Sequence, residues 1–229
     1  TGTSFYTGVY EFNFSVYDCK SKAITRFIEQ GPKVPQGLIN GFKEKFSDLI
    51  KESSCVVFSG SKGYQMSDSI YAQLITIANK NNIPAFLDTR HQALKKGIIA
   101  RPHLVKPNLQ ELEEFAGEKL TSTKAIISSI KKIHDYGVET VVVSLGAQGA
   151  IGSHQSEVYK IIPPRVSVKN DIGCGDTLLA GYIYAWCKGE NFLTSLMTAV
   201  AAGTVNATHS RPGEIEKGQL KKLIQKLKV

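Results

Sequence analysis

The sequence alternates short apolar runs with segments of helical periodicity, and this alternation restricts the fold more than any other feature. Four apolar runs of strand length occupy residues 55–58, 84–87, 103–105 and 140–143. Segments with apolar residues three or four apart lie between them, as over 70–78 and 126–133. Strands that alternate with helices form a parallel sheet whose two faces are both covered. The sequence therefore predicts an α/β fold.

The two ends of the chain follow other patterns. Residues 10–18 and 23–28 alternate apolar and polar side chains on either side of a turn, which predicts an antiparallel hairpin. Two short strands are expected near 150–151 and 158–162, and helices over 178–186, 191–207 and 214–228. No linker or repeat divides the chain, so we expect one domain over 1–229. It would have a β hairpin at about 9–30 and an α/β core at about 35–229.

Composition excludes several classes of protein. With 42% hydrophobic and 21% charged residues among 229, the chain is neither disordered nor a coiled coil, and no apolar stretch could span a bilayer. Net charge is +8, but the lysines are dispersed and thickest on an amphipathic C-terminal helix, so no nucleic-acid partner is expected. Four well-separated cysteines indicate neither a zinc site nor a disulfide framework. We expect a cytoplasmic protein with no membrane partner.

Polar residues follow all four central strands. They are Ser59-Gly60-Ser61, Asp88-Thr89, Lys106-Pro107-Asn108 and Ser144-Leu145-Gly146. The carboxyl ends of parallel strands form the ligand crevice of open α/β sheets. One shared site is therefore expected there.

The segment Gly173-Cys174-Gly175-Asp176 precedes a helical pattern. Two glycines at a helix start let backbone N–H groups line an anion hole. Asp176 beside it would serve as a base that accepts a hydroxyl proton. The alternative, equally weighted on this motif alone, is an ordinary loop with Asp176 as N-cap.

Two other motifs allow both functional and structural interpretations. The segment from Ser144 to Gly149 could let a nucleotide approach the backbone, although a β-hairpin turn is favoured on the pattern alone. Asn108 and Glu111 lie three apart at a helix start. They could hold Mg²⁺ through water or form a capping box, and the two roles are compatible.

Together these segments resemble the ribokinase-type (PfkB) carbohydrate kinase family over nearly the whole chain, with Gly173-Cys174-Gly175-Asp176 as its signature. The resemblance implies a three-layer α/β/α sandwich with a small β lid, and a chain that lacks the N-terminal part of the domain. The order of Ser59-Gly60-Ser61, Asp88-Thr89 and Lys106-Pro107-Asn108 is also the family's. Within the family, the sequence most resembles the kinases of phosphorylated ketohexoses.

The resemblance implies a role for each matching residue. Asp176 would be the catalytic base, and Gly173, Cys174 and Gly175 the anion hole. The nucleotide, ATP, would lie near Ser144, Leu145, Gly146, Gln148, Gly149 and Asn206, with Asn206 near its base. Mg²⁺ would bind near Asn108 and Glu111 through water, and Ser61 would bind the sugar. The family's lid arginine is missing near Phe12-Asn13, so Lys62 and Arg90 are the candidates for the substrate-phosphate contact, unless both are solvated surface charges.

The implied reaction is ATP-dependent phosphorylation of fructose 1-phosphate to fructose 1,6-bisphosphate. The alternatives are a tagatose-6-phosphate kinase, a kinase for a neutral sugar or nucleoside, or a catalytically silent nucleotide-binding protein, which Asp176 argues against. The partners implied are a small-molecule sugar phosphate and a second copy of the chain, joined through the β lid.

Overall fold

The computed structural model describes residues 13–18, 20–21, 24–29 and 31–229. In chain order, the elements before the middle of the sheet are β1 (Asn13–Tyr17), β2 (Ile24–Ile28), α1 (Gln36–Leu49), the 3₁₀ turn η1 (Ile50–Glu52), β3 (Val56–Ser59), α2 (Ile70–Lys80), β4 (Ala85–Asp88), α3 (His91–Ile99) and β5 (Leu104–Val105). The rest are α4 (Leu109–Ala116), α5 (Thr123–Asp135), β6 (Thr140–Ser144), η2 (Gly146–Gln148), β7 (Ala150–His154), β8 (Glu157–Ile161), α6 (Cys174–Cys187), α7 (Phe192–Ala207) and α8 (Lys217–Ile224).

Six strands form one sheet in the order β3-β4-β5-β6-β7-β8. The pairs from β3 to β6 are parallel, which confirms the predicted parallel sheet, and β7 and β8 extend it antiparallel. The pattern had predicted both of these last strands but not their direction. The helix α3, which the periodicity did not predict, follows β4 directly.

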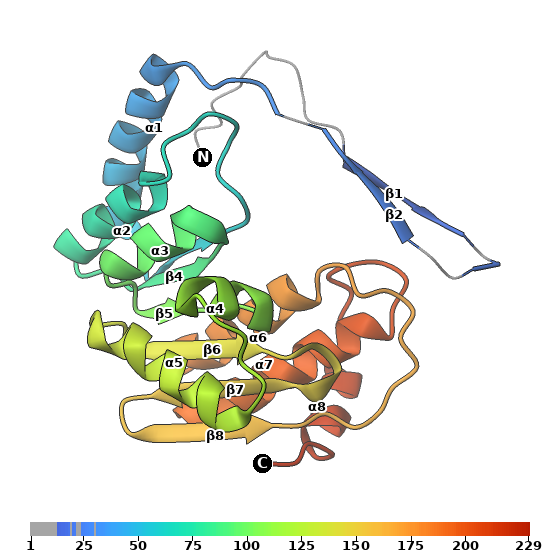
Figure 1. The fold of residues 1–229 in the computed structure, drawn as a ribbon. Coiled ribbons are helices and arrows are strands. Elements are labelled where there is room, and N and C mark those ends of the chain that lie inside the picture. The colour runs from blue at the N-terminus through green and yellow to red at the C-terminus, as the bar shows by residue number, and fades with distance from the viewer. Residues whose placement is uncertain (1–12, 19, 22–23, 30) are drawn as a thin grey trace.

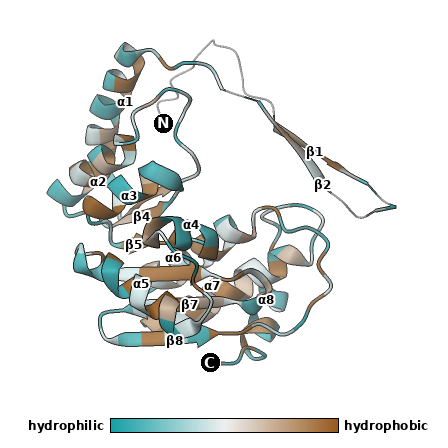
Figure 2. Ribbon diagram, in the orientation of Figure 1, coloured by the Kyte–Doolittle hydropathy of each residue, from teal (hydrophilic) through white to brown (hydrophobic). Residues whose placement is uncertain are grey.

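Apolar side chains alternate between the two faces of the sheet, because successive strand residues point in opposite directions. Leu87 packs in the cluster that includes residues of α2 to α5, whereas its neighbour Phe86 packs in the cluster with α6 and α7. In the same way Val142 faces α6 and α7, opposite to Val141 and Val143. The result is the predicted α/β/α sandwich, with apolar strands between the helices (Figures 1 and 2).

The hairpin of β1 and β2 extends away from the sandwich (Figure 1). The strands pair antiparallel, from Asn13 opposite Ile28 to Tyr17 opposite Ile24, which confirms the predicted hairpin over these residues. The parts of that prediction at 9–12, 19, 22–23 and 30 lie outside the described residues. Phe14 and Phe27 stack at 4.7 Å between ring centroids, and both are about half exposed.

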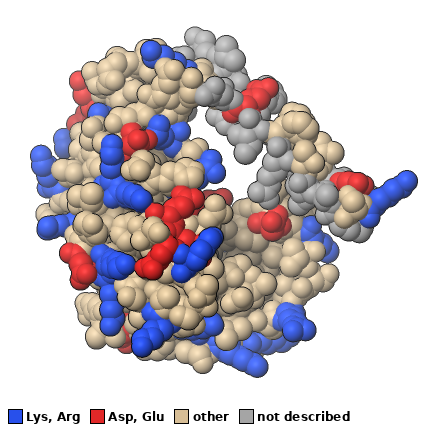
Figure 3. Space-filling model, in the orientation of Figure 1, with Lys and Arg blue, Asp and Glu red and all other residues tan. Residues whose placement is uncertain are grey.

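Surface charge is dispersed on the face shown in Figure 3, where lysine and arginine side chains surround a central group of acidic ones and form no continuous basic stripe. Within the part of the chain that the structure describes, no helix has both the length and the apolar character needed to cross a membrane.

Candidate active site

The first turn of α6 carries the signature segment. Gly173 is the N-cap residue with φ of 76°, a left-handed conformation that glycine adopts without strain, and its carbonyl accepts the Thr177 amide at 2.8 Å. The N–H groups of a first turn have no intrahelical acceptor and form the positive end of the helix. Asp176 is the third helical residue and is exposed, so the N-cap role falls to Gly173 and not to Asp176.

A cavity of about 270 Å³ lies in front of this turn. Its lining comes from the carboxyl ends of β3 and β4 and from the starts of α3, α4 and α6. The lining residues are Ser59, Gly60, Ser61, Asp88, Thr89, Arg90, Glu111, Gly175 and Asp176. The Ser59 hydroxyl donates a hydrogen bond to Oδ1 of Asp176 at 3.0 Å, which joins the end of β3 to the start of α6. The strand ends therefore share one site, as the sequence predicts.

An ion pair lies beside this cavity. The ammonium of Lys106, just after β5, is 3.0 Å from Oδ2 of Asp88 at the end of β4, and the two side chains are only 5% and 15% exposed. Burial raises the pKa of Asp88, and the nearby Asp176 raises it further, whereas Lys106 acts in the opposite direction. The sequence placed both residues at the expected crevice, because they follow strands, but gave neither a specific role.

Thr89, which follows Asp88 at the end of β4, also belongs to the site. It is 4% exposed and lines the cavity, and its hydroxyl has no hydrogen-bond partner among the described protein atoms. A buried hydroxyl without a partner costs about 1–3 kcal/mol. Thr89 is therefore suited to contact a polar ligand.

Asn108 and Glu111 form the predicted capping box at the start of α4. The Asn108 side chain accepts the Glu111 amide, and Glu111 Oε2 accepts the Asn108 amide, each at 2.9 Å. Glu111 also lines the cavity, and burial raises the pKa of its carboxyl. Over the described residues, no three His, Cys, Asp or Glu side chains are grouped to hold a metal ion. The Glu111 carboxylate at the cavity is an oxygen ligand of the type that Mg²⁺ takes, and magnesium binding here stays a prediction.

The segment from Ser144 to Gly149 forms the turn between β6 and β7, in which Ser144 pairs with Ala150. Gly149 has φ of 86°, and a Cβ there would collide with the Ile161 carbonyl, so this glycine has a packing reason of its own. Ser144 lies next to Asn108 through a parallel bridge, while Gln148 is exposed. The hairpin-turn interpretation is therefore confirmed, and nucleotide contact by this segment stays a prediction.

Asn206 on α7 is fully buried. Its amide donates to the Ile172 carbonyl at 2.9 Å and to Cys174 Sγ at 3.2 Å, and its oxygen accepts the Gly213 amide at 2.7 Å. A contact with a nucleotide base would require these bonds to be released. In this structure Asn206 joins the signature loop to the segment after α7, and its place near the nucleotide base stays a prediction.

The two candidate cations for a substrate phosphate differ in their surroundings. Arg90 lines the cavity at the N-cap of α3. Lys62 does not line it: its ammonium is 3.3 Å from Asp68 and donates to the Met66 carbonyl at 2.7 Å. Of the two, Arg90 lines the cavity, as does Ser61, and contact with a substrate phosphate by either cation stays a prediction.

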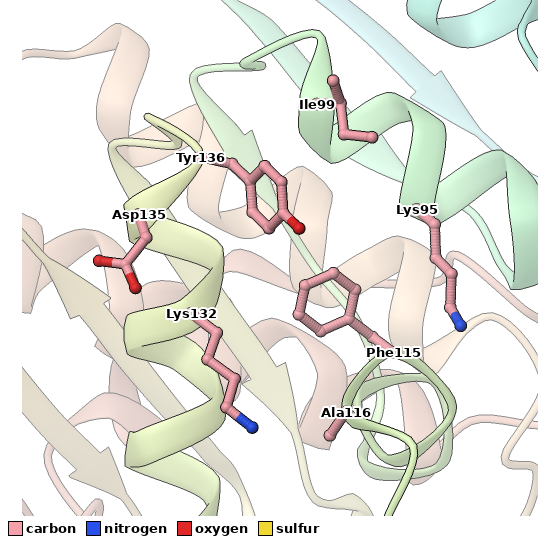
Figure 4. Close-up of a pocket in the computed structure, with 7 residues that line it drawn as sticks. All are labelled: Lys95, Ile99, Phe115, Ala116, Lys132, Asp135 and Tyr136. Carbon is pink, nitrogen blue, oxygen red and sulfur yellow. The ribbon is translucent and has the colours of Figure 1, made fainter.

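A larger cavity of about 600 Å³ lies among α3, α4 and α5 (Figure 4). Its lining includes Lys95, Lys132 and the edge-to-face pair of Phe115 and Tyr136. It shares no lining residue with the cavity at Asp176.

A helix N-terminus that faces a cavity at the carboxyl ends of an open α/β sheet is a place where phosphate groups commonly bind. The model of the pfkB family of carbohydrate kinases matches residues 33–217. The chain belongs to this family, and it is a sugar kinase.

Solved structures agree with this assignment. Phosphofructokinase-2 from Escherichia coli in complex with potassium is 25% identical, and the match covers 93% of this chain and 69% of that one with a TM-score of 0.85. A possible 1-phosphofructokinase from Thermotoga maritima is 23% identical over 95% of this chain and 69% of its own, with a TM-score of 0.82. Ribokinase from Arabidopsis thaliana, complexed with ribose and ATP, is 19% identical over 94% and 69%, with a TM-score of 0.75. The last two show similarity of fold.

Proposed function

We propose that the protein transfers the γ-phosphoryl group of ATP to a hydroxyl of a phosphorylated ketohexose, with fructose 1-phosphate as the acceptor and fructose 1,6-bisphosphate as the product. The observation that carries the proposal is Asp176, exposed at the N-terminus of α6 and held by the Ser59 hydroxyl at 3.0 Å. A carboxylate beside an anion-binding helix N-terminus can act as a general base that accepts the proton of the attacking hydroxyl.

The reaction assigns a role to each part of the site. The acceptor oxygen forms a bond to the γ-phosphorus while the bond to the ADP oxygen breaks, and the hydroxyl proton passes to Asp176. The backbone amides of Cys174 and Gly175 at the start of α6 stabilise charge on the transferred group. Mg²⁺, when bound near Asn108 and Glu111, would neutralise charge on the nucleotide phosphates.

The proposal of a phosphorylated acceptor is supported by Arg90. Its guanidinium can bind a phosphate with two parallel hydrogen bonds, and it is the one Lys or Arg among the lining residues described. Thr89 and Ser61, which also line the cavity, supply hydroxyls for the sugar. Phosphofructokinase-2 from Escherichia coli, which has a similar fold, was solved in complex with fructose 6-phosphate, and this supports a phosphorylated ketohexose as the acceptor.

An acceptor panel tests the proposal. Initial rates of ADP release would be measured with fructose 1-phosphate, tagatose 6-phosphate, fructose 6-phosphate, fructose, ribose and adenosine. The highest kcat/KM is expected for fructose 1-phosphate. A higher value for another phosphosugar would reassign the substrate, and a preference for a neutral sugar or nucleoside would refute the phosphosugar proposal.

We also propose a homodimer through the β lid, for which the exposed face of Phe14, Val16 and Phe27 gives the support. These side chains are 47–53% exposed on a two-stranded sheet, a large apolar surface for so small an element. Light scattering on the wild type and on Val16→Lys should show loss of the dimer in the variant. A monomeric wild type would refute this assembly.

A further inference from the structure

Two cysteines that are far apart in the sequence lie next to each other in the fold. Cys55 directly precedes β3, and Cys187 is the last residue of α6. Burial raises the pKa of the Cys55 thiol, and the Cys187 side chain raises it further, through charge and through a side-chain hydrogen bond. Neither cysteine forms a disulfide in this structure, and the proposed reaction uses neither of them.

The packing of the sheet against α6 explains why the two thiols meet. Val57 and Phe86 are register partners in neighbouring parallel strands, so they share one face of the sheet. Cys55, two residues before Val57, lies on the same face. The Phe86 ring packs edge to face on Trp186, with 5.2 Å between the centroids, and Trp186 directly precedes Cys187. Because Cys55 and Trp186 both pack against the cluster that contains Phe86, the contact follows from the positions of β3, β4 and α6.

Both thiols are open to a reagent from solution. Cys187 is exposed, and Cys55 is partly exposed. A thiol in contact with solvent can attack a small disulfide, and a neighbouring thiol can then displace the reagent from the mixed disulfide. Cys174, the third described cysteine, lies at the opposite end of the 14-residue helix, about 20 Å away along its axis. Among the described cysteines, only Cys55 is therefore placed to pair with Cys187 within one chain.

We propose that Cys55 and Cys187 are a modification site, at which a low-molecular-weight disulfide such as oxidised glutathione converts the two thiols to a disulfide bond. The Cys187 thiolate attacks one sulfur of the reagent and releases one glutathione thiolate. The Cys55 thiolate then attacks the Cys187 sulfur of the mixed disulfide and releases the second. Two protein thiols are oxidised and the reagent disulfide is reduced to two thiols, which take up the two protons that the cysteines lose.

The bond joins the same two elements that meet at the candidate active site. At the other end of both elements, the Ser59 hydroxyl of β3 donates to Asp176 of α6 at 3.0 Å. The disulfide therefore holds β3 and α6 together at the end opposite to this hydrogen bond. A disulfide that closes a long segment of chain restricts the unfolded state strongly, so the oxidised protein is the more stable form. The proposal does not depend on which acceptor is phosphorylated.

Peptide mapping and thermal melts test the proposal. The reduced protein is incubated with oxidised glutathione and digested without reductant. Mass spectrometry should find the peptides of Cys55 and Cys187 joined to each other, with no glutathione on either. Non-reducing electrophoresis should show a single chain and no cross-linked dimer. The melting temperature should rise by about 5–15 °C on oxidation, and dithiothreitol should reverse both changes.

Single variants are the matched controls. In Cys55→Ser, Cys187 should keep glutathione as a mixed disulfide, because no neighbouring thiol displaces it, and the melting temperature should not rise. Cys187→Ser, at an exposed position, should also show no rise, and it keeps the test valid if Cys55→Ser folds poorly. Cys174→Ser should form the same joined peptides as the wild type. A wild type that leaves Cys55 and Cys187 unjoined, or that joins either of them to Cys174, would overturn the proposal, and so would joined peptides without a rise in melting temperature.

Discussion

Replacing Asp176 by Asn tests the proposed base with little structural disturbance. The Asn side chain has the same shape, and its Oδ1 can still accept the Ser59 hydroxyl that lies 3.0 Å from Oδ1 of Asp176. Because Asp176 is exposed to the cavity, no buried charge is created or removed. What is lost is the ability to accept a proton, which contributes about 10²–10⁴ in rate, or about 2.7–5.4 kcal/mol of transition-state stabilisation.

The assay measures initial rates of ADP release with a saturating sugar phosphate, along with the Kd of ADP and the melting temperature. We expect kcat to fall by about 10²–10⁴ in Asp176→Asn, with the other two quantities near wild type. Ser59→Ala should lower kcat by less than this, since it removes the orienting bond and keeps the base. A folded Asn variant with near-wild-type kcat would refute the assignment, and a Ser59→Ala variant as slow as Asp176→Asn would show that orientation dominates.

Three further variants test the surrounding residues. Cys174→Ala should keep kcat within about twofold, because the proposed anion contact of Cys174 is through its backbone amide and not its thiol. It should lower the melting temperature slightly, since Sγ accepts a hydrogen bond from Asn206. A variant that folds but is inactive would contradict the expected kcat. Arg90→Ala should raise KM for a sugar phosphate about 10- to 150-fold, the equivalent of about 1.5–3 kcal/mol for a charged hydrogen bond, and leave KM for a neutral sugar unchanged. Lys62→Ala is the control, because its ammonium is occupied by Asp68, and an equal effect in both variants would refute the Arg90 contact. Burial raises the pKa of Glu111 above its ordinary value of 4.5, so the folded state binds the carboxyl proton more tightly than the unfolded chain does. The free energy of unfolding therefore falls as the pH rises from 4.5 through the pKa of the folded state. Glu111→Gln should therefore be more stable than wild type at neutral pH and lose this advantage below pH 4.5. It should also phosphorylate sugars more slowly. A difference in melting temperature between variant and wild type that stays constant across this pH range would contradict the raised pKa.

The thiol of Cys174 shows how local and tertiary effects oppose each other. A helix N-terminus by itself lowers the pKa of a cysteine and makes it reactive. In this fold burial raises the pKa of Cys174, and the hydrogen bond from Asn206 counteracts it only in part. Knowledge of the helix start, which the sequence provides, was therefore not enough to predict the reactivity of the thiol.

Local patterns were sufficient to predict most of the helices and strands and much of the site. Side-chain periodicity identifies β3 to β6 and most helices, because the alternation of apolar residues is imposed by burial on both faces of the sheet. The signature segment and the capping box could also be predicted from the sequence, since Gly173, Asn108 and Glu111 make their hydrogen bonds within the first turn of their own helix. Polar residues after parallel strands predicted a shared crevice, because such strand ends necessarily meet at one edge.

Contacts between distant segments were decided only by the tertiary structure. The pairing of Asp88 with Lys106, the burial of Asn206 and the capture of Lys62 by Asp68 each depend on which side chain a neighbouring element presents. A sequence shows that a lysine follows a strand, but not whether water, a carboxylate or a ligand meets its ammonium. Side-chain periodicity is a property of one segment, so the sequence is enough to detect it. The electrostatic environment of a site depends on charged side chains from several elements, which only folding brings together.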